Sequence, residues 1–108
     1  MEHREPFFAV LDFGTGGGKC ALFDAEGRCL SVARREWSYS SVPFEHSELT
    51  GGFAFDPHSF WAALCACARE AVDEAGLAPE AIAGIGTTAQ RLGSVFLDAR
   101  GREIYAAP

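Results

Sequence analysis

Short apolar runs separated by polar turns dominate the first 40 residues of the chain. The apolar run Phe7–Leu11 is rich in strand-forming residues, which predicts a central strand covered on both faces. A second strand is predicted to start at Lys19 and end at Phe23. Residues Asp24–Gly27 then make a hairpin turn, with Gly27 in a left-handed conformation. A third strand is predicted over Cys29–Tyr39, so three consecutive antiparallel strands are expected.

The apolar pattern is lost over Ser40–Phe55, where serine, proline, glycine, glutamate and aromatic residues mix. No strand or helix period holds there, so an irregular loop is predicted. A loop of this length in a compact domain usually carries function or moves. A surface excursion without a role is the alternative.

A helical pattern follows this loop. Asp56 is placed to cap the first free N–H groups, and Pro57 suits the first helical position. Gly76 is predicted to end the helix as a left-handed cap. Trp61 is assigned to the core rather than to a binding site. The apolar positions at helical spacing predict one buried stripe, made of Phe60, Trp61, Leu64, Cys65, Ala68, Ala71, Val72 and Ala75.

The run Ile82–Thr88 is short, apolar and rich in small residues, which suits a second central strand. The preceding helix supplies the crossover that a strand parallel to the first one needs. Residues Ala89–Gly93 follow its carboxyl end, where ligands bind in open α/β sheets. Ser94–Leu97 and Glu103–Tyr105 are predicted to pair as a final hairpin. The pattern therefore predicts an α/β fold.

The richest chemistry lies between the first two strands. Asp12 places a carboxylate where the first strand leaves the core, Thr15 adds a hydroxyl and Lys19 a cation. Glycine has no Cβ and reaches positive φ freely, so a glycine loop approaches a ligand closely and turns its N–H groups toward an anion. A carboxylate for Mg²⁺ beside such a loop suits nucleotide phosphates. The glycines are Gly14, Gly16, Gly17 and Gly18.

Two better-known glycine motifs do not fit this loop. A dinucleotide fingerprint needs a glycine where Lys19 stands and a helix after it, yet a strand is predicted there. A P-loop needs glycine at Phe13 and a hydroxyl at Cys20. A phosphate loop inside a β-hairpin remains, and a glycine-rich hairpin turn without a ligand is the alternative.

Composition and charge limit the class of partner. The 108 residues are 48% hydrophobic and 22% charged, which suits one ordinary globular domain. A net charge of −6 disfavours nucleic acid and anionic membranes as partners. The sequence has neither an apolar run of about 20 residues nor a signal peptide, so a cytoplasmic protein is predicted. The cysteines lack the spacing of a metal or disulfide site and are predicted to be reduced.

Taken together, the motifs resemble one family. The stretch Leu11–Lys19 is similar to the first phosphate motif of the actin, hexokinase and heat-shock-chaperone superfamily. Over residues 7–108 the chain is similar to the N-terminal segment of FGGY carbohydrate kinases. Four features carry this resemblance in order: the Asp12–Thr15 loop, the Phe23–Gly27 turn, the Phe55–Asp56–Pro57 helix entry with Trp61, and Ile85–Gln90.

This resemblance implies an RNase-H-like, actin-like ATPase sheet: an antiparallel three-strand meander, a crossover helix, a parallel fourth strand and a hairpin. Residues 1–108 would be the N-terminal part of the first kinase domain, a fragment without the rest of that domain or the second domain. The intact enzyme would transfer the γ-phosphoryl group of ATP to a sugar or polyol hydroxyl. The resemblance leaves a homodimer of that enzyme open, and the fragment alone is expected to be inactive.

By the same resemblance, Asp12 would orient Mg²⁺ with ATP, and the loop from Gly14 to Lys19, with Thr15, Gly16, Gly17 and Gly18, would hold the phosphates. Gln90 and Arg91 would face the sugar. The catalytic base of the family lies outside this chain.

The substrate stays open. Leu92 stands where glycerol kinases have glutamate, and Arg91–Leu92 departs from the xylulokinase pattern. The segments around Trp37, Pro43 and Asp56 are more similar to the autoinducer-2 kinase branch. Two other classes remain: a nuclease, disfavoured because only Asp12 is well placed, and a non-catalytic module that binds ATP, phosphate or sugar.

Overall fold

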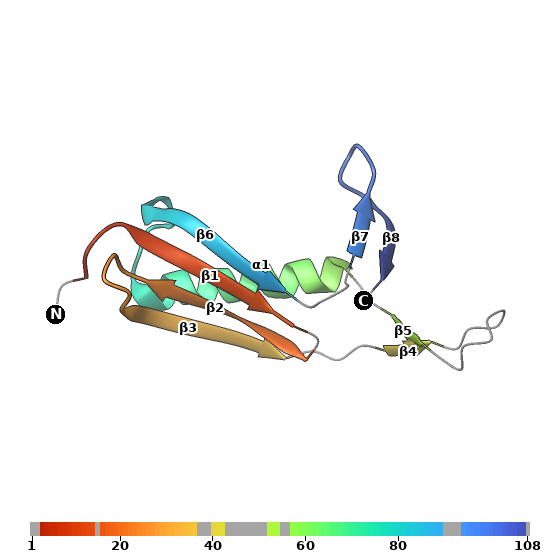
Figure 1. Cartoon of the computed structure of the whole chain (residues 1–108), viewed down its shortest axis with the longest axis horizontal. Helices are drawn as coiled ribbons and strands as arrows, with labels where there is room; N and C mark the ends of the chain where they lie inside the picture. Colours follow the sequence, from red (N-terminus) through yellow and green to blue (C-terminus); the bar gives the residue numbers. More distant parts are fainter. Residues whose placement is uncertain are drawn as a thin grey trace.

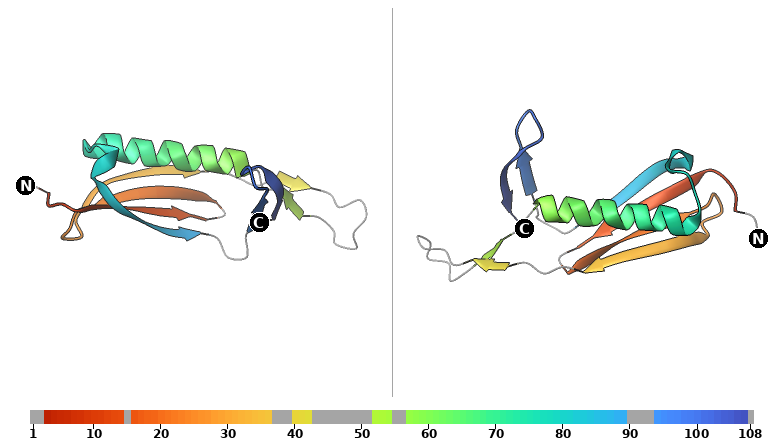
Figure 2. Two further views of the ribbon diagram at one scale, coloured as in Figure 1. Left: turned by 90° about the horizontal axis from the view of Figure 1, so that it is seen from above. Right: turned by 180° about the vertical axis from the view of Figure 1, so that it is seen from behind.

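The chain is described here from a computed structural model, which covers residues 3–14, 16–36, 40–42, 52–54, 57–89 and 94–107. A four-stranded sheet with one helix on one face forms the body of the molecule (Figures 1 and 2). Two small hairpins lie beyond one end of this sheet (Figure 1). The elements are β1 (Phe7–Phe13), β2 (Gly17–Phe23), β3 (Cys29–Glu36), β4 (Ser40–Val42), β5 (Gly52–Ala54), α1 (Pro57–Ala75), the 3-10 turn η1 (Pro79–Ala81), β6 (Ile82–Ala89), β7 (Ser94–Leu97) and β8 (Glu103–Ala107).

The strand order of the main sheet is β3-β2-β1-β6. Strands β1, β2 and β3 pair antiparallel through short turns, and β6 returns parallel to β1 after the crossover through α1. The predicted meander, crossover helix and parallel fourth strand are therefore confirmed. Gly27 has φ +80° and Gly76 has φ +70°, as predicted for the hairpin turn and the helix cap.

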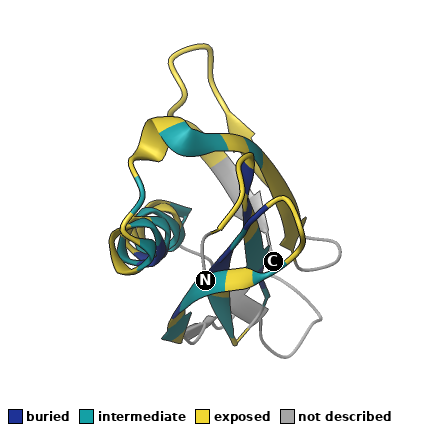
Figure 3. Cartoon of the chain, turned by 90° about the vertical axis from the view of Figure 1, so that its left-hand side faces the viewer, coloured by how far each residue is buried: buried dark blue, intermediate teal, exposed yellow. Residues whose placement is uncertain are grey.

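The core lies between α1 and the sheet (Figure 3). The Phe13 ring, only 2% exposed, meets the Phe60 ring edge-on at a centroid distance of 5.6 Å. Ser31 Oγ donates to the Ala71 carbonyl at 2.6 Å, and Cys67 Sγ donates to the Ala33 carbonyl at 3.0 Å. These contacts fix α1 over β1, β2 and β3. The fully or nearly fully buried residues of this core are Ala9, Phe13, Cys20, Leu22, Ala33, Cys67 and Ala71.

Two buried thiols sit in this core. Burial, and to a lesser degree the neighbouring Cys67, raises the pKa of Cys20 to about 11. Burial also raises the pKa of Cys67. Both thiols therefore stay protonated at neutral pH and serve as small apolar residues.

The predicted burial of β1 on both faces is wrong for the described chain. Phe8 and Val10 are 41% and 37% exposed, on the face turned away from α1. The predicted central position of the fourth strand is also wrong, because β6 lies at the sheet edge and Ile85 is 65% exposed. The reason is the position of α1, which packs mainly on β2 and β3 and leaves most of β6 beyond Ile82 exposed.

The predicted helix stripe needs one correction. Trp61 is 64% exposed, so its assignment to the core is wrong, whereas Cys67, which is not part of the predicted stripe, is fully buried. Successive residues on a helix turn by about 100°, so the contact face runs through Phe60, Leu64, Cys67 and Ala71. Trp61 falls beside this face. The predicted cap at Asp56 lies outside the described residues.

Several strand boundaries also differ from the predicted ones. The first strand continues to Phe13 and the second begins at Gly17, so Gly17 and Gly18 are strand residues and not loop residues. The third strand ends at Glu36, and residues 37–39 lie outside the described part of the chain. The predicted irregular loop over Ser40–Phe55 contains β4 and β5, which pair antiparallel. Strands of three residues are too short to show a period of two in the sequence.

Among the described residues, no helix has the length and apolar character needed to cross a lipid bilayer.

Candidate functional site

The candidate site begins with a cross-strand pair of charges. Asp12 on β1 and Lys19 on β2 are register partners, and Lys19 Nζ lies 3.9 Å from Asp12 Oδ2. Both side chains are 46% exposed. Because Phe13 points into the core, the neighbouring Asp12 points to the opposite face of the sheet, away from α1. The carboxylate and the ammonium group therefore meet in the open, where both can reach a ligand.

The loop joining these strands is short and closed by a backbone hydrogen bond. The Gly14 N–H donates to the Gly17 carbonyl at 2.9 Å, so this amide is already used within the turn. Thr15 lies outside the described residues. None of the glycines at 14, 16, 17 and 18 has φ in the left-handed region. The expected use of positive φ is therefore wrong here, and the missing Cβ is what matters.

The glycines divide into two groups by what a Cβ would meet. At Gly18 a Cβ would lie 2.4 Å from the Phe13 ring, and at Gly17 it would lie 2.7 Å from the Arg35 carbonyl. Packing within the sheet is enough to explain why these two positions are glycine. At Gly16 a Cβ would meet nothing within 4 Å, so packing does not explain this glycine. Gly16 is thus the position at which close approach of a ligand best accounts for the absent side chain.

An open cavity of about 350 Å³ lies over this loop. Strand β3 contributes to it, which sequence reasoning missed. The signal was present: the tight Asp24–Gly27 turn sets the register of β2 against β3 and makes Arg34 the partner of Lys19. The lining residues are Asp12, Gly14, Gly16, Gly17, Gly18, Lys19, Arg34, Arg35 and Glu36.

The two arginines of β3 have different surroundings. The Arg35 guanidinium pairs with Glu70 on α1 at 2.5 Å and donates to the Arg34 carbonyl at 2.7 Å. Arg35 therefore ties β3 to the helix. The Arg34 side chain is exposed and has neither an ion pair nor a hydrogen bond within the described ranges.

The donor set suits a magnesium–phosphate ligand rather than a protein-only metal site. No group of three His, Cys, Asp or Glu side chains able to hold a metal occurs in the described part of the chain. Mg²⁺ usually keeps several waters and binds through one or two carboxylates together with substrate phosphates. One open carboxylate, Asp12, beside cations and an uncrowded glycine fits that mode.

Gln90 and Arg91, predicted to face the substrate, lie outside the described residues. The last described residue before them, Ala89, is the register partner of Phe13, and Thr88 is the partner of Asp12. The carboxyl end of β6 is therefore beside the strand that carries Asp12.

A second cavity, of about 400 Å³, lies between the first turn of α1 and the β7–β8 hairpin. Trp61 lines it, which accounts for the exposure of that ring at the end of the helix. Its other described lining side chains are mostly apolar, including Phe60, Val95 and Leu97, and no Lys or Arg is among these described residues. Its described lining therefore supplies no cation for a phosphate group.

Comparison with known proteins agrees with this geometry. The family model of the FGGY family of carbohydrate kinases, N-terminal domain, matches residues 7–108. The autoinducer-2 kinase of Escherichia coli (strain K12) is 35% identical over 106 residues, which is 98% of this chain and 19% of that protein. The autoinducer-2 kinase of Salmonella typhimurium (strain LT2) is 32% identical over 100 residues, covering 93% and 18% of the two chains.

Solved structures of carbohydrate kinases also resemble this chain. A xylulose kinase from Brucella ovis superposes with a TM-score of 0.71 at 26% identity, covering 93% of this chain and 20% of that one. The xylulose kinase from Rhodospirillum rubrum, at 24% identity, shares the fold with a TM-score of 0.72 over 93% of this chain and 19% of that one. The chain spans about one fifth of the length of these relatives. On the match over residues 7–108 and the identity to curated kinases, the chain belongs to the FGGY family of carbohydrate kinases.

Proposed function

We propose that this chain carries the phosphate-binding part of an ATP-dependent carbohydrate kinase, which transfers the γ-phosphoryl group of ATP to a sugar or polyol hydroxyl. The observation that supports this best is the open Asp12–Lys19 pair, 3.9 Å apart, at the edge of an uncrowded glycine loop. Phosphoryl transfer depends mainly on positioning and charge stabilisation, and these residues provide both.

Each residue has a role in this proposal. Asp12 orients Mg²⁺ through its exposed carboxylate, and the bound ion would neutralise charge on the phosphates. Lys19 adds a point charge beside it. Gly16 leaves room for the phosphate oxygens. Thr15 and the amides of Gly17 and Gly18, at the start of β2, are proposed as further donors, as is the Gly14 amide once its turn bond opens.

The sugar side of the proposal rests on Gln90 and Arg91, which follow β6 directly. The curated relatives are named autoinducer-2 kinases, so we propose autoinducer-2 as the first substrate to test, followed by xylulose. No described residue is assigned as catalytic base. We therefore expect the 108-residue chain alone to bind Mg·ATP without transferring phosphate. A cytoplasmic location and a homodimer of the intact enzyme remain predictions.

The test is ADP release by the longest product of this reading frame, with ATP, Mg²⁺ and a panel of autoinducer-2, xylulose, other ketoses and polyols. Asp12→Asn should lower the rate by about 100-fold or more, in the range of lost electrostatic groups at such sites. Asp73→Asn, which removes an exposed carboxylate from the far side of α1, is the matched control and should keep full activity.

A second candidate function is a non-catalytic module that binds ATP or another phosphate compound. It is supported by the absence of an assigned base among the described residues. Binding of Mg·ATP with no substrate-dependent ADP release in the longer product would favour this module. Substrate-dependent ADP release that is unchanged in the Asp12→Asn variant would contradict both candidates. It would show catalysis, against the module, and catalysis without Asp12, against the proposed site.

A further inference from the structure

The register of the sheet aligns four polar side chains in one row. Asp12 pairs with Thr88 on β6 and with Lys19 on β2, and Lys19 pairs with Arg34 on β3. Register partners point to the same face, so the row Thr88, Asp12, Lys19, Arg34 crosses the whole sheet on the side away from α1. Figure 1 shows these four strands side by side.

The charges in this row are unbalanced. Lys19 and Arg34 stand directly opposite each other on antiparallel strands, where Cβ atoms are about 4.5–5.5 Å apart and like charges destabilise the sheet. Asp12 is 3.9 Å from Lys19, and it is the one carboxylate in the row. An anion placed over Lys19 and Arg34 would remove this repulsion.

Arg34 is open for such an anion. Glu36 lies two residues further along β3, on the same side, yet no ion pair joins it to Arg34 within the described ranges. The adjacent Arg35 is different because its guanidinium is held by Glu70. Both arginines line the cavity over the glycine loop, but Arg35 is held by Glu70, whereas the Arg34 guanidinium has no partner within the described ranges.

We propose that Arg34 is a second phosphate-binding cation, which contacts the same polyphosphate group as Lys19. The inference rests on the proposed function, in which this cavity receives nucleotide phosphates. A guanidinium binds phosphate oxygens through two parallel hydrogen bonds, which the Lys19 ammonium cannot do. Arg34 thus widens the site from the β1–β2 hairpin to β3, and it favours ligands with two or more phosphates.

The test is calorimetric titration of the 108-residue chain with Mg·ATP and with inorganic tripolyphosphate, at low and at physiological salt. Arg34→Ala should weaken both affinities about tenfold, as expected for a charge-assisted hydrogen bond. It should also reduce the salt dependence of binding, because one cation is lost. Arg34→Lys should fall between the parent and Arg34→Ala. Arg69→Ala, which removes an exposed arginine on the far side of α1, should change affinity by less than about twofold.

Thermal unfolding without ligand checks that the variants fold. Arg34→Ala should melt no lower than the parent, since it removes a like-charge pair, and Arg34→Gln provides a second uncharged variant. If the parent binds and Arg34→Ala behaves like Arg69→Ala, the inference is wrong while the proposed function stands. If the parent binds neither Mg·ATP nor tripolyphosphate, both are wrong.

Discussion

At the scale of single residues, Gly16 and Gly18 are glycine for different structural reasons. Gly18 faces the Phe13 ring, which is buried and held by Phe60 and so has no room to move. Gly16 faces open space on the same hairpin. The absence of a side chain at Gly18 makes room for the Phe13 ring. At Gly16 it keeps the cavity accessible from outside.

We predict that Gly18→Ala destabilises the chain by about 1–3 kcal/mol, the usual cost of overpacking a core. Gly16→Ala should change the free energy of unfolding by less than about 0.5 kcal/mol and should weaken Mg·ATP binding instead. Urea unfolding and calorimetry on the two variants separate these effects. Equal stability of the two variants would contradict the packing assignment.

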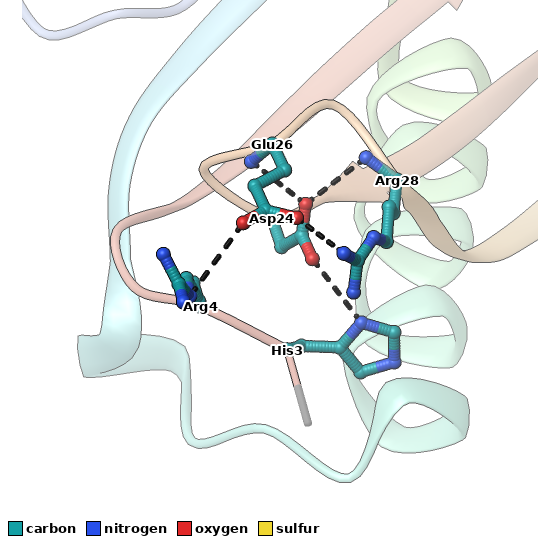
Figure 4. A network of polar contacts seen from close by, with 5 residues as sticks. All are labelled: His3, Arg4, Asp24, Glu26 and Arg28. Carbon is teal, nitrogen blue, oxygen red and sulfur yellow. Dashed lines mark hydrogen bonds and ion pairs between the residues drawn. The ribbon is translucent and has the colours of Figure 1, made fainter. Parts of the chain in front are cut away.

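Asp24 is the one polar side chain among the described residues that is almost fully buried, at 2% exposure. Its carboxylate accepts backbone N–H bonds from Glu26 at 2.9 Å and Arg28 at 3.0 Å, and lies 3.3 Å from His3 Nδ1 (Figure 4). Burial alone would raise the pKa of Asp24. The hydrogen bonds and the Arg28 charge outweigh burial and hold that pKa below its ordinary value of 3.8.

Because the folded-state pKa of Asp24 is lowered, its contribution to stability is present above the ordinary pKa and is lost as pH falls through the lower folded value. We predict that the parent loses stability below about pH 4 and that Asp24→Ala loses less over the same range, measured by urea unfolding at several pH values. Asp98→Ala is the control, since Asp98 accepts the same two backbone bonds in an exposed turn. The Asp98 variant should keep the acid sensitivity of the parent.

At the scale of elements, the position of α1 decides which strands are buried. The helix is tied to β3 by Ser31, Cys67 and Arg35, and it packs on β2 through Leu22 and Cys20. Strand β6 lies at the sheet edge, where Ile82 packs against the core and Ile85 is exposed. Apolar residues of similar size therefore differ widely in how much they contribute to the free energy of unfolding.

Leu22→Ala should cost about 2–5 kcal/mol, because Leu22 is fully buried under the helix. Ile85→Ala should cost less than about 1 kcal/mol in the same chain, because Ile85 is 65% exposed. Chemical denaturation of the two variants measures the difference. Similar costs at both positions would mean that β6 is covered in solution.

At the scale of the whole molecule, a chain with net charge −6 gathers Lys19 and Arg34 at one cavity. Local positive charge in an acidic protein is what recruitment of an anionic ligand requires. A ligand that binds only the folded chain raises its stability by mass action.

We predict that Mg·ATP at 100 times its Kd stabilises the chain by about 2.7 kcal/mol. Removing Mg²⁺ with EDTA, or changing Asp12 to Asn, should abolish most of this gain. Thermal melts with and without nucleotide provide the measurement. A gain that survives both changes would place the nucleotide elsewhere on the molecule.

Much of the architecture was readable from local pattern, because turns and helix ends depend on neighbouring residues. Gly27 and Gly76 marked the hairpin turn and the helix cap, and Pro57 marked the helix start. Asp12 and its glycines lie at the turn between β1 and β2, and their phosphate-binding role stays a prediction. The same motifs, taken in order, identified the family.

Tertiary structure alone decided the rest, because contacts between distant residues depend on register and on the position of α1. It exposed Trp61, buried Cys67 and moved β6 to the sheet edge. It also made Gly18 a packing requirement of Phe13 and brought Arg34 beside Lys19. Local sequence specifies which residues form turns, strands and helices, whereas the pairing of strands decides which side chains share a site.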